Sequence, residues 1–180
     1  MSLRRALYRA RQFWHAWSAS PAAEDLDAVK ELLTPAQMAL FNRMQPSEQA
    51  HSLAVMEQIR NAPGEISQPY WHDLLVASLL HDVGKTRYPL HVWERVAIVL
   101  CEAVAPSLAE RLGKGSPQGW RHAFVVARKH AEWGAEMAAE AGSSSLTTEI
   151  IRRHQNQPAA QAVSIAEELQ RVLYAADNDH

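Results

Sequence analysis

Apolar residues recur at three- and four-residue steps along most of the chain, and this periodicity limits the fold more than any other feature. The last such stretch carries Ile165, Leu169 and Leu173 on one face. This spacing is typical of amphipathic α-helices, whereas a half-buried strand would alternate apolar and polar residues. We find no convincing alternation of that kind. The sequence therefore predicts an all-α fold.

Turn and capping residues predict where the helices begin and end. Thr34-Pro35-Ala36-Gln37 indicates a helix start, with a capping-box glutamine and a proline at the first helical position. We expect helices from Pro46 through Ala62, from Pro69 to Gly84 and from Val92 to Val104. The helical pattern should stop at Pro106 and give way to a loop rich in Gly and Pro around Gly113 to Gly119. Three more helical stretches are predicted, with breaks near His130-Ala131, at Gly142-Ser143-Ser144 and around Gln157-Pro158.

The chain has 180 residues, of which 47% are hydrophobic, so one domain can close without disulfides. Residues 1–44 are predicted to be an N-terminal helical extension packed on the core, and residues 45–180 the main domain. Within the extension, Leu3 to Trp17 carries an apolar stripe and a basic face, which we interpret as a helix that docks on its own domain.

Charge and cysteine content indicate which classes of partner and which cellular compartment are expected. The formal charge of −2 provides no global positive field, so a nucleic-acid partner is not expected. No run of about 18 apolar residues is present, so we expect no membrane association. The start of the chain lacks the apolar core of a signal peptide, and the single cysteine, Cys101, lies in an apolar run. These features favour a cytoplasmic protein.

Two His-Asp dipeptides occur, and their surroundings differ. His72-Asp73 falls in a first helical turn, where an aspartate meets the positive end of the helix dipole, so we interpret this pair as structural or solvent-facing. His81-Asp82 instead follows an apolar run and precedes Gly84. A buried charge there requires a partner, and a helix that ends at this point lets both side chains turn to one cation.

An imidazole nitrogen and a carboxylate oxygen make half of a mixed site that suits Mn, Fe, Co, Zn or Mg rather than a thiolate-binding metal. The other ligands must come from elsewhere in the chain. His51 and Asp177 both lie beside apolar neighbours and can face the interior. Taken singly, each also fits a core histidine or a solvated carboxylate.

Together these residues resemble the HD superfamily, in which a histidine, a His-Asp pair and a late aspartate bind the catalytic metal. The resemblance covers roughly Ser47 to Asp177 and includes the string from Leu80 to Lys85, which is similar to the family's His-Asp-Ile-Gly-Lys. It implies an HD-domain helical bundle with extra N-terminal helices. It also implies that His51, His81, Asp82 and Asp177 hold the metal.

Two further segments resemble a binuclear branch of that family. His130 begins a segment similar to its His-Pro-Glu-Ile-Gly, and His154 stands where a helix of the branch ends in paired histidines. Gln155 replaces the second histidine, and a neutral amide is a weaker ligand. Two hypotheses follow: a second metal bridged by Asp82, or a single metal with His130 and His154 contacting substrate as acid candidates.

The resemblance implies a phosphohydrolase in which a metal activates water for attack on a small phosphate ester, such as a nucleotide. Asp82 would orient the water, and Lys85 would offset phosphate charge, with Arg152 and Arg153 as further cations. Both arginines fit equally well as complements to a helix C-terminus. Two alternatives remain open: a di-iron oxygenase of the same fold, and a non-catalytic nucleotide-sensing module.

Overall fold

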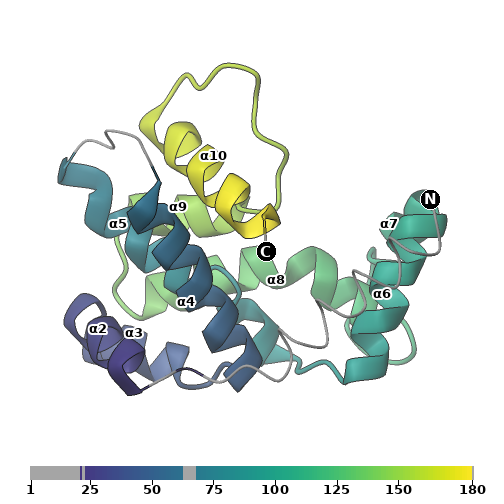
Figure 1. The fold of residues 1–180 in the computed structure, drawn as a ribbon. Helices are drawn as coiled ribbons and strands as arrows, with labels where there is room; N and C mark the ends of the chain where they lie inside the picture. The colour runs from purple at the N-terminus through teal and green to yellow at the C-terminus, as the bar shows by residue number, and fades with distance from the viewer. Residues whose placement is uncertain (1–20, 22, 63–67, 180) are drawn as a thin grey trace.

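The structure is a computed structural model, and it describes residue 21 and residues 23–62 and 68–179; the predicted helix from Leu3 to Trp17 lies outside this part. The described part contains helices and no strand (Figure 1). The elements are α2 (Ala23–Leu32), α3 (Pro35–Phe41), α4 (Pro46–Asn61), α5 (Gln68–Leu80), the 3-10 helix η1 (Val83–Arg87), α6 (Val92–Val104), α7 (Pro106–Leu112), α8 (His122–Glu140), α9 (Ser145–Arg153) and α10 (Ile165–Asn178). The all-α prediction is confirmed.

Local sequence signals fixed several helix starts as predicted. The hydroxyl of Thr34 accepts a hydrogen bond from the Gln37 backbone N–H, and the Gln37 side chain accepts one from the Thr34 N–H, so the capping box forms. Pro46 occupies the first turn of α4, where its missing N–H costs nothing.

The structure corrects three helix predictions. α8 runs without a break through His130, because Ala131 is a strong helix former and no proline interrupts the segment. α6 ends at Val104 as predicted, but Pro106 starts the short helix α7 before the Gly-rich loop, since proline fits the first turn of a helix. The helix predicted to reach Gly84 ends at Leu80, and η1 covers the following turn.

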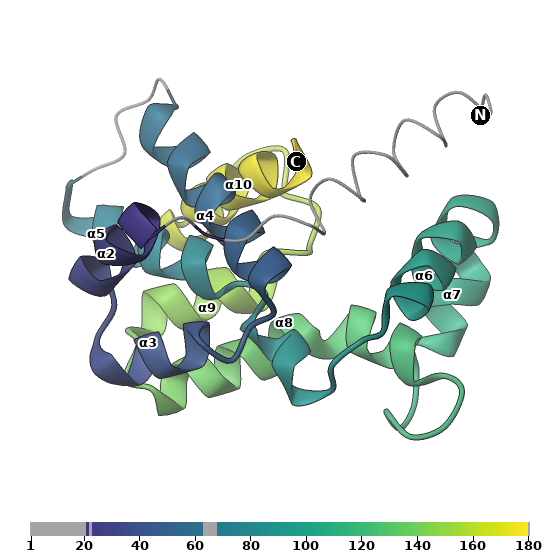
Figure 2. The ribbon, with the colours of Figure 1, turned by 60° about the horizontal axis from the view of Figure 1, so that its bottom comes forward.

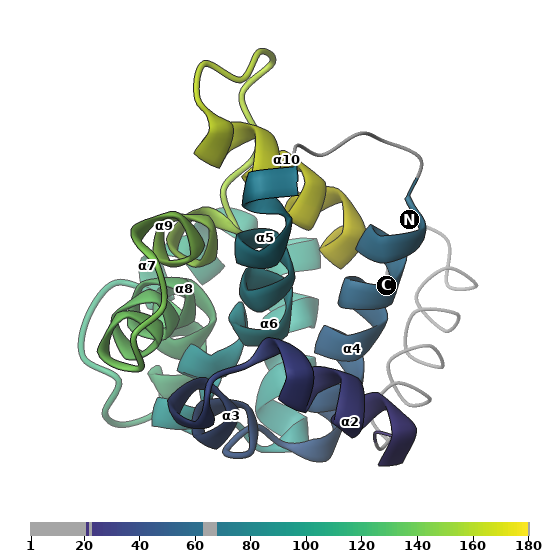
Figure 3. The same cartoon turned by 90° about the vertical axis from the view of Figure 1, so that its left-hand side faces the viewer.

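The main core surrounds α5, whose residues from Leu74 to Leu80 are all buried. This helix packs between α4 and α9 (Figure 3), and α10 covers the same region. The segment before α4 contributes Val29, Leu33 and Phe41 to the same buried cluster. The division of the chain at residue 44 stays a prediction.

A second, smaller core lies where α6 and α7 meet one end of α8 (Figure 2). Leu90, Ile98, Val125 and Trp133 are buried there. Cys101 is half-buried on α6 rather than a core residue. None of the described helices is long and apolar enough to cross a membrane.

Candidate metal centre

Residues far apart in the sequence meet where α5 ends. The Nε2–H of His51 on α4 donates a hydrogen bond of 2.8 Å to Oδ1 of Asp177 on α10. Nε2 of His81, which directly follows α5, lies 3.5 Å from the same oxygen. These three side chains form a first group whose ligand atoms all lie within 4.8 Å of one another, close enough to share one cation.

A second group forms around Asp82. Its Oδ1 lies 3.3 Å from Nε2 of His130 on α8 and 3.9 Å from Nε2 of His154, which caps α9. Its Oδ2 lies 3.7 Å from Nε2 of His81 and accepts a hydrogen bond from the ammonium of Lys85. One carboxylate oxygen therefore faces each group, so Asp82 stands between the two.

Backbone carbonyls fix the orientation of the three buried imidazoles. Because a carbonyl only accepts, each Nδ1 must carry the proton. The bonds run from His81 to Ser78 O (2.8 Å), from His130 to Val126 O (3.1 Å) and from His154 to Ile151 O (2.8 Å). Each ring therefore directs its Nε2 toward the cluster, which is the nitrogen left to bind a metal when Nδ1 is held by a carbonyl.

The cluster fits a divalent cation. Nε2 of His81 is fully buried and has no hydrogen-bond partner in the described part of the chain. Leaving a buried polar atom unsatisfied costs about 1–3 kcal/mol, which a coordinated cation would offset. The nearby donors are imidazole nitrogens and carboxylate oxygens, a set that suits the predicted Mn, Fe, Co, Zn or Mg.

The charges in the cluster influence one another strongly. Burial alone would lower the pKa of His81, but Asp82 and Asp177 outweigh it and raise that pKa. Burial alone would raise the pKa of Asp82, but Lys85 and His81 hold it well below its usual range. Burial, followed by the nearby rings of His81 and His130, lowers the pKa of His154 to about 3. At neutral pH the carboxylates are therefore ionised and His154 is neutral, the protonation states that metal binding requires.

Close packing of two backbones holds the groups together. Gly84 in η1 lies against α8 near His130 and Gly134, with no space for a Cβ atom. This contact places the end of α5 beside the part of α8 that carries His130. The glycine after the His-Asp pair is thus needed for the close approach of α8 to η1.

Other predicted residues lie outside the cluster. Gln155 is exposed, and its amide donates a hydrogen bond to Ala127 O (3.1 Å). Arg152 pairs with Glu149, and Arg153 pairs with Glu149 and Glu167, so both have acidic partners on the surface.

The His72-Asp73 pair also lies away from the cluster. His72 is exposed, and the Asp73 carboxylate accepts hydrogen bonds from the hydroxyls of Ser144 and Thr147 at the start of α9. The prediction of a structural or solvent-facing pair is confirmed.

A cavity of about 240 Å³, here called the inner cavity, opens beside the cluster. Its lining includes Lys85, His130 and Arg95, whose guanidinium forms an ion pair with Glu48 on α4. Sequence reasoning missed Arg95 and Glu48. The available signal was a lone arginine in the apolar run of α6 and a glutamate one turn before His51.

In a comparison with protein families, a family model described as HD domain matches residues 49–180. No curated protein and no solved structure matches the chain.

Proposed function

The chain belongs to the HD domain family, and we propose that it is a metal-dependent phosphohydrolase that cleaves small phosphate esters such as nucleotides. HD domains bind divalent metals and are generally hydrolases. One observation carries the proposal for this chain: the buried Nε2 of His81 has no hydrogen-bond partner among the described residues and lies within 4 Å of the carboxylates of Asp82 and Asp177.

In this proposal His51, His81, Asp82 and Asp177 hold one metal tightly. Asp82, His130 and His154 hold a second metal weakly or instead contact substrate. The division of the two carboxylate oxygens of Asp82 between the groups supports a shared ligand. Gln155 donates its amide to Ala127 and adds no imidazole to the second group, which supports the weaker affinity.

A divalent cation bound here would supply a Lewis acid for the phosphoryl oxygen and lower the pKa of a coordinated water. The chain's own residues do the rest. Asp82 orients the attacking water, and Lys85 and Arg95 offset the charge of the phosphate. His130 lines the inner cavity, whereas His154 does not, so His130 is the better placed donor of a proton to the leaving oxygen.

The function is tested by phosphate release from a panel of nucleotides and other phosphoesters with added Mn, Mg, Co or Fe. We expect turnover that depends on metal and is lost in His51→Ala. His72→Ala is the matched control, because this exposed histidine lies outside the cluster. No phosphate release with any metal would contradict the proposal.

Elemental analysis of the wild type and of three variants tests the metal number. We expect one tightly bound equivalent, lost in His51→Ala and kept in His130→Ala and His154→Ala, with reduced turnover in the last two. Two equivalents in the wild type, falling to one in His130→Ala or His154→Ala, would instead indicate a binuclear centre.

The shared position of Asp82 also favours one second candidate, a di-iron oxygenase. Oxygen consumption by iron-loaded protein, without phosphate release, would support that candidate over hydrolysis. Nucleotide binding without either reaction would support the sensing module.

A further inference from the structure

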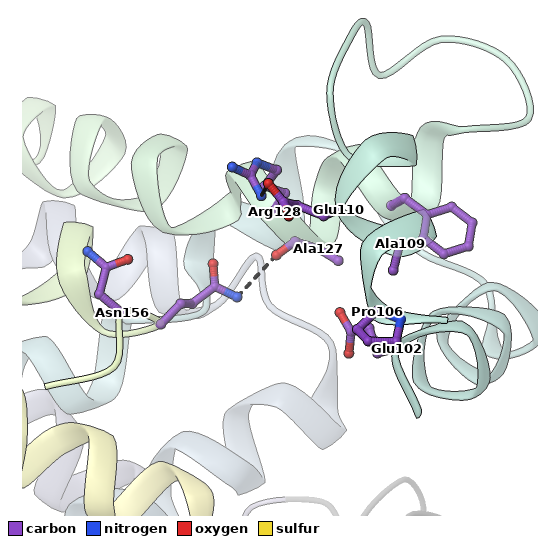
Figure 4. A pocket seen from close by; sticks show the side chains of 9 residues that line it. Glu102, Pro106, Ala109, Glu110, Ala127, Arg128 and Asn156 are labelled. Atoms are coloured by element: carbon purple, nitrogen blue, oxygen red, sulfur yellow. Dashed lines mark hydrogen bonds and ion pairs between the residues drawn. The ribbon is translucent and has the colours of Figure 1, made fainter. Parts of the chain in front are cut away.

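The inner cavity continues away from the metal centre. A second cavity of about 410 Å³, here called the outer cavity and shown in Figure 4, adjoins it. The two linings share Glu102, Ala127 and Gln155. Glu102 and Asn156 lie on opposite sides of the outer cavity. A molecule bound at the metal centre could therefore extend past Glu102.

One face of α6 lines the inner cavity with an ordered sequence of chemistries. Arg95 lies at one end of this face, Ile98 and Val99 follow, and Glu102 lies at the other end. Residues seven positions apart in a helix are two turns, or about 10 Å, apart along its axis. The face thus presents a cation, an apolar surface and a carboxylate in a fixed order.

The cationic end of this α6 face lies beside the metal centre. The Glu48 carboxylate holds the guanidinium of Arg95, and both residues are largely buried. Lys85 and His130 line the same cavity. An anionic phosphate is therefore favoured at this end, which leaves the alcohol part of an ester to extend toward Glu102.

Glu102 differs from the other acid of the two cavities. Glu110 pairs with Lys114 (3.1 Å) and Arg128 (3.9 Å). Glu102 forms no ion pair or hydrogen bond in the part of the chain that is described. Glu102 is exposed at the cavity mouth, and partial desolvation by its neighbours raises its pKa, which a bound cation would offset.

From this arrangement we infer that Glu102 selects the substrate by binding a positively charged amine on its alcohol part. The substrate class is a phosphate monoester of an amino alcohol with an apolar spacer, and the inference rests on the proposed function. Glu102 binds and makes no bond: water and ester give inorganic phosphate and the free amino alcohol. The amine remains unchanged.

Paired substrates test the inference. The probes are aminohexyl phosphate and hexyl phosphate, which differ only by the terminal amine. The metal-loaded wild type should show a kcat/KM for the aminohexyl ester up to about fivefold higher than for the hexyl ester, the upper end of what an exposed ion pair contributes. Glu102→Gln keeps the size and removes the charge, so the ratio should fall toward one. Glu140→Gln, an exposed residue outside both cavities, should leave the ratio unchanged.

Calorimetric binding of aminohexylphosphonate and hexylphosphonate separates this inference from the proposed function, since a phosphonate carbon–phosphorus bond resists hydrolysis. If the wild type binds aminohexylphosphonate more tightly than hexylphosphonate and Glu102→Gln abolishes this difference, the inference is supported even if no ester is turned over. Turnover of both esters with equal kcat/KM would overturn the inference but leave the hydrolase proposal standing. Equal binding of both phosphonates would also overturn the inference.

Discussion

Replacement of Gly84 by alanine should test how the metal centre is assembled. Gly84 does not have a positive φ, so alanine introduces no backbone strain at this position. What changes is the available space. A Cβ atom at residue 84 would lie 1.9 Å from the backbone oxygen of His130 and 2.6 Å from the backbone nitrogen of Gly134.

The expected loss of stability follows from these distances. Ordinary contact begins near 3.4 Å, so η1 and α8 must separate by about 1.5 Å (3.4 − 1.9) at this point. Overpacking of this kind costs about 1–3 kcal/mol, and a rigid backbone neighbour places Gly84→Ala at the upper end. For a chain of this size each kcal/mol lowers Tm by about 2–4 °C, which gives a decrease of about 6–12 °C.

The separation should also move His130 away from Asp82 and weaken the second group. Circular dichroism melts and elemental analysis of Gly84→Ala measure both effects. Gly134→Ala is the matched control: its Cβ would meet Gly84 N at 3.2 Å, and alanine gains up to about 1 kcal/mol in helix propensity. If Gly84→Ala melted like the wild type and kept its turnover, the close approach would not be what positions His130.

Three further outcomes are expected. His81→Ala should lose bound metal while His72→Ala keeps it; elemental analysis showing the reverse would refute the choice between the two His-Asp pairs. Chelation should lower Tm, because a metal at 100 times its Kd adds about 2.7 kcal/mol to the native state only, and a melt indifferent to chelator and metal would contradict this. Burial alone would raise the pKa of Glu94, but the His91 backbone and the His122 side chain lower it below its usual 4.5. Its contribution to stability is therefore present above pH 4.5 and lost as pH falls through the lower folded-state value. Glu94→Gln should accordingly lower Tm more at neutral pH than in acid. An equal decrease in Tm at the two pH values would count against a stabilising interaction between Glu94 and His122.

The sequence by itself determined the local structure and the first identification of the centre. Caps such as that of Thr34 with Gln37 depend on residues three positions apart, so they can be recognised in any chain. The apolar run before His81-Asp82 indicated that this pair, and not His72-Asp73, is buried. Local reasoning failed at His130, where the predicted break is absent, and after Pro106, where the short helix α7 was not predicted.

Only the tertiary structure decided how the ligand atoms are grouped. His51 and Asp177 are 126 positions apart, and no local preference encodes their 2.8 Å contact. The placement of Asp82 between two groups depends on the packing of α8 against η1, which no periodicity predicts. Arg95 likewise joins the centre only because Glu48, on another helix, fixes its guanidinium. Such contacts arise from the packing of distant segments, and side-chain directions at a site are set only when those segments meet.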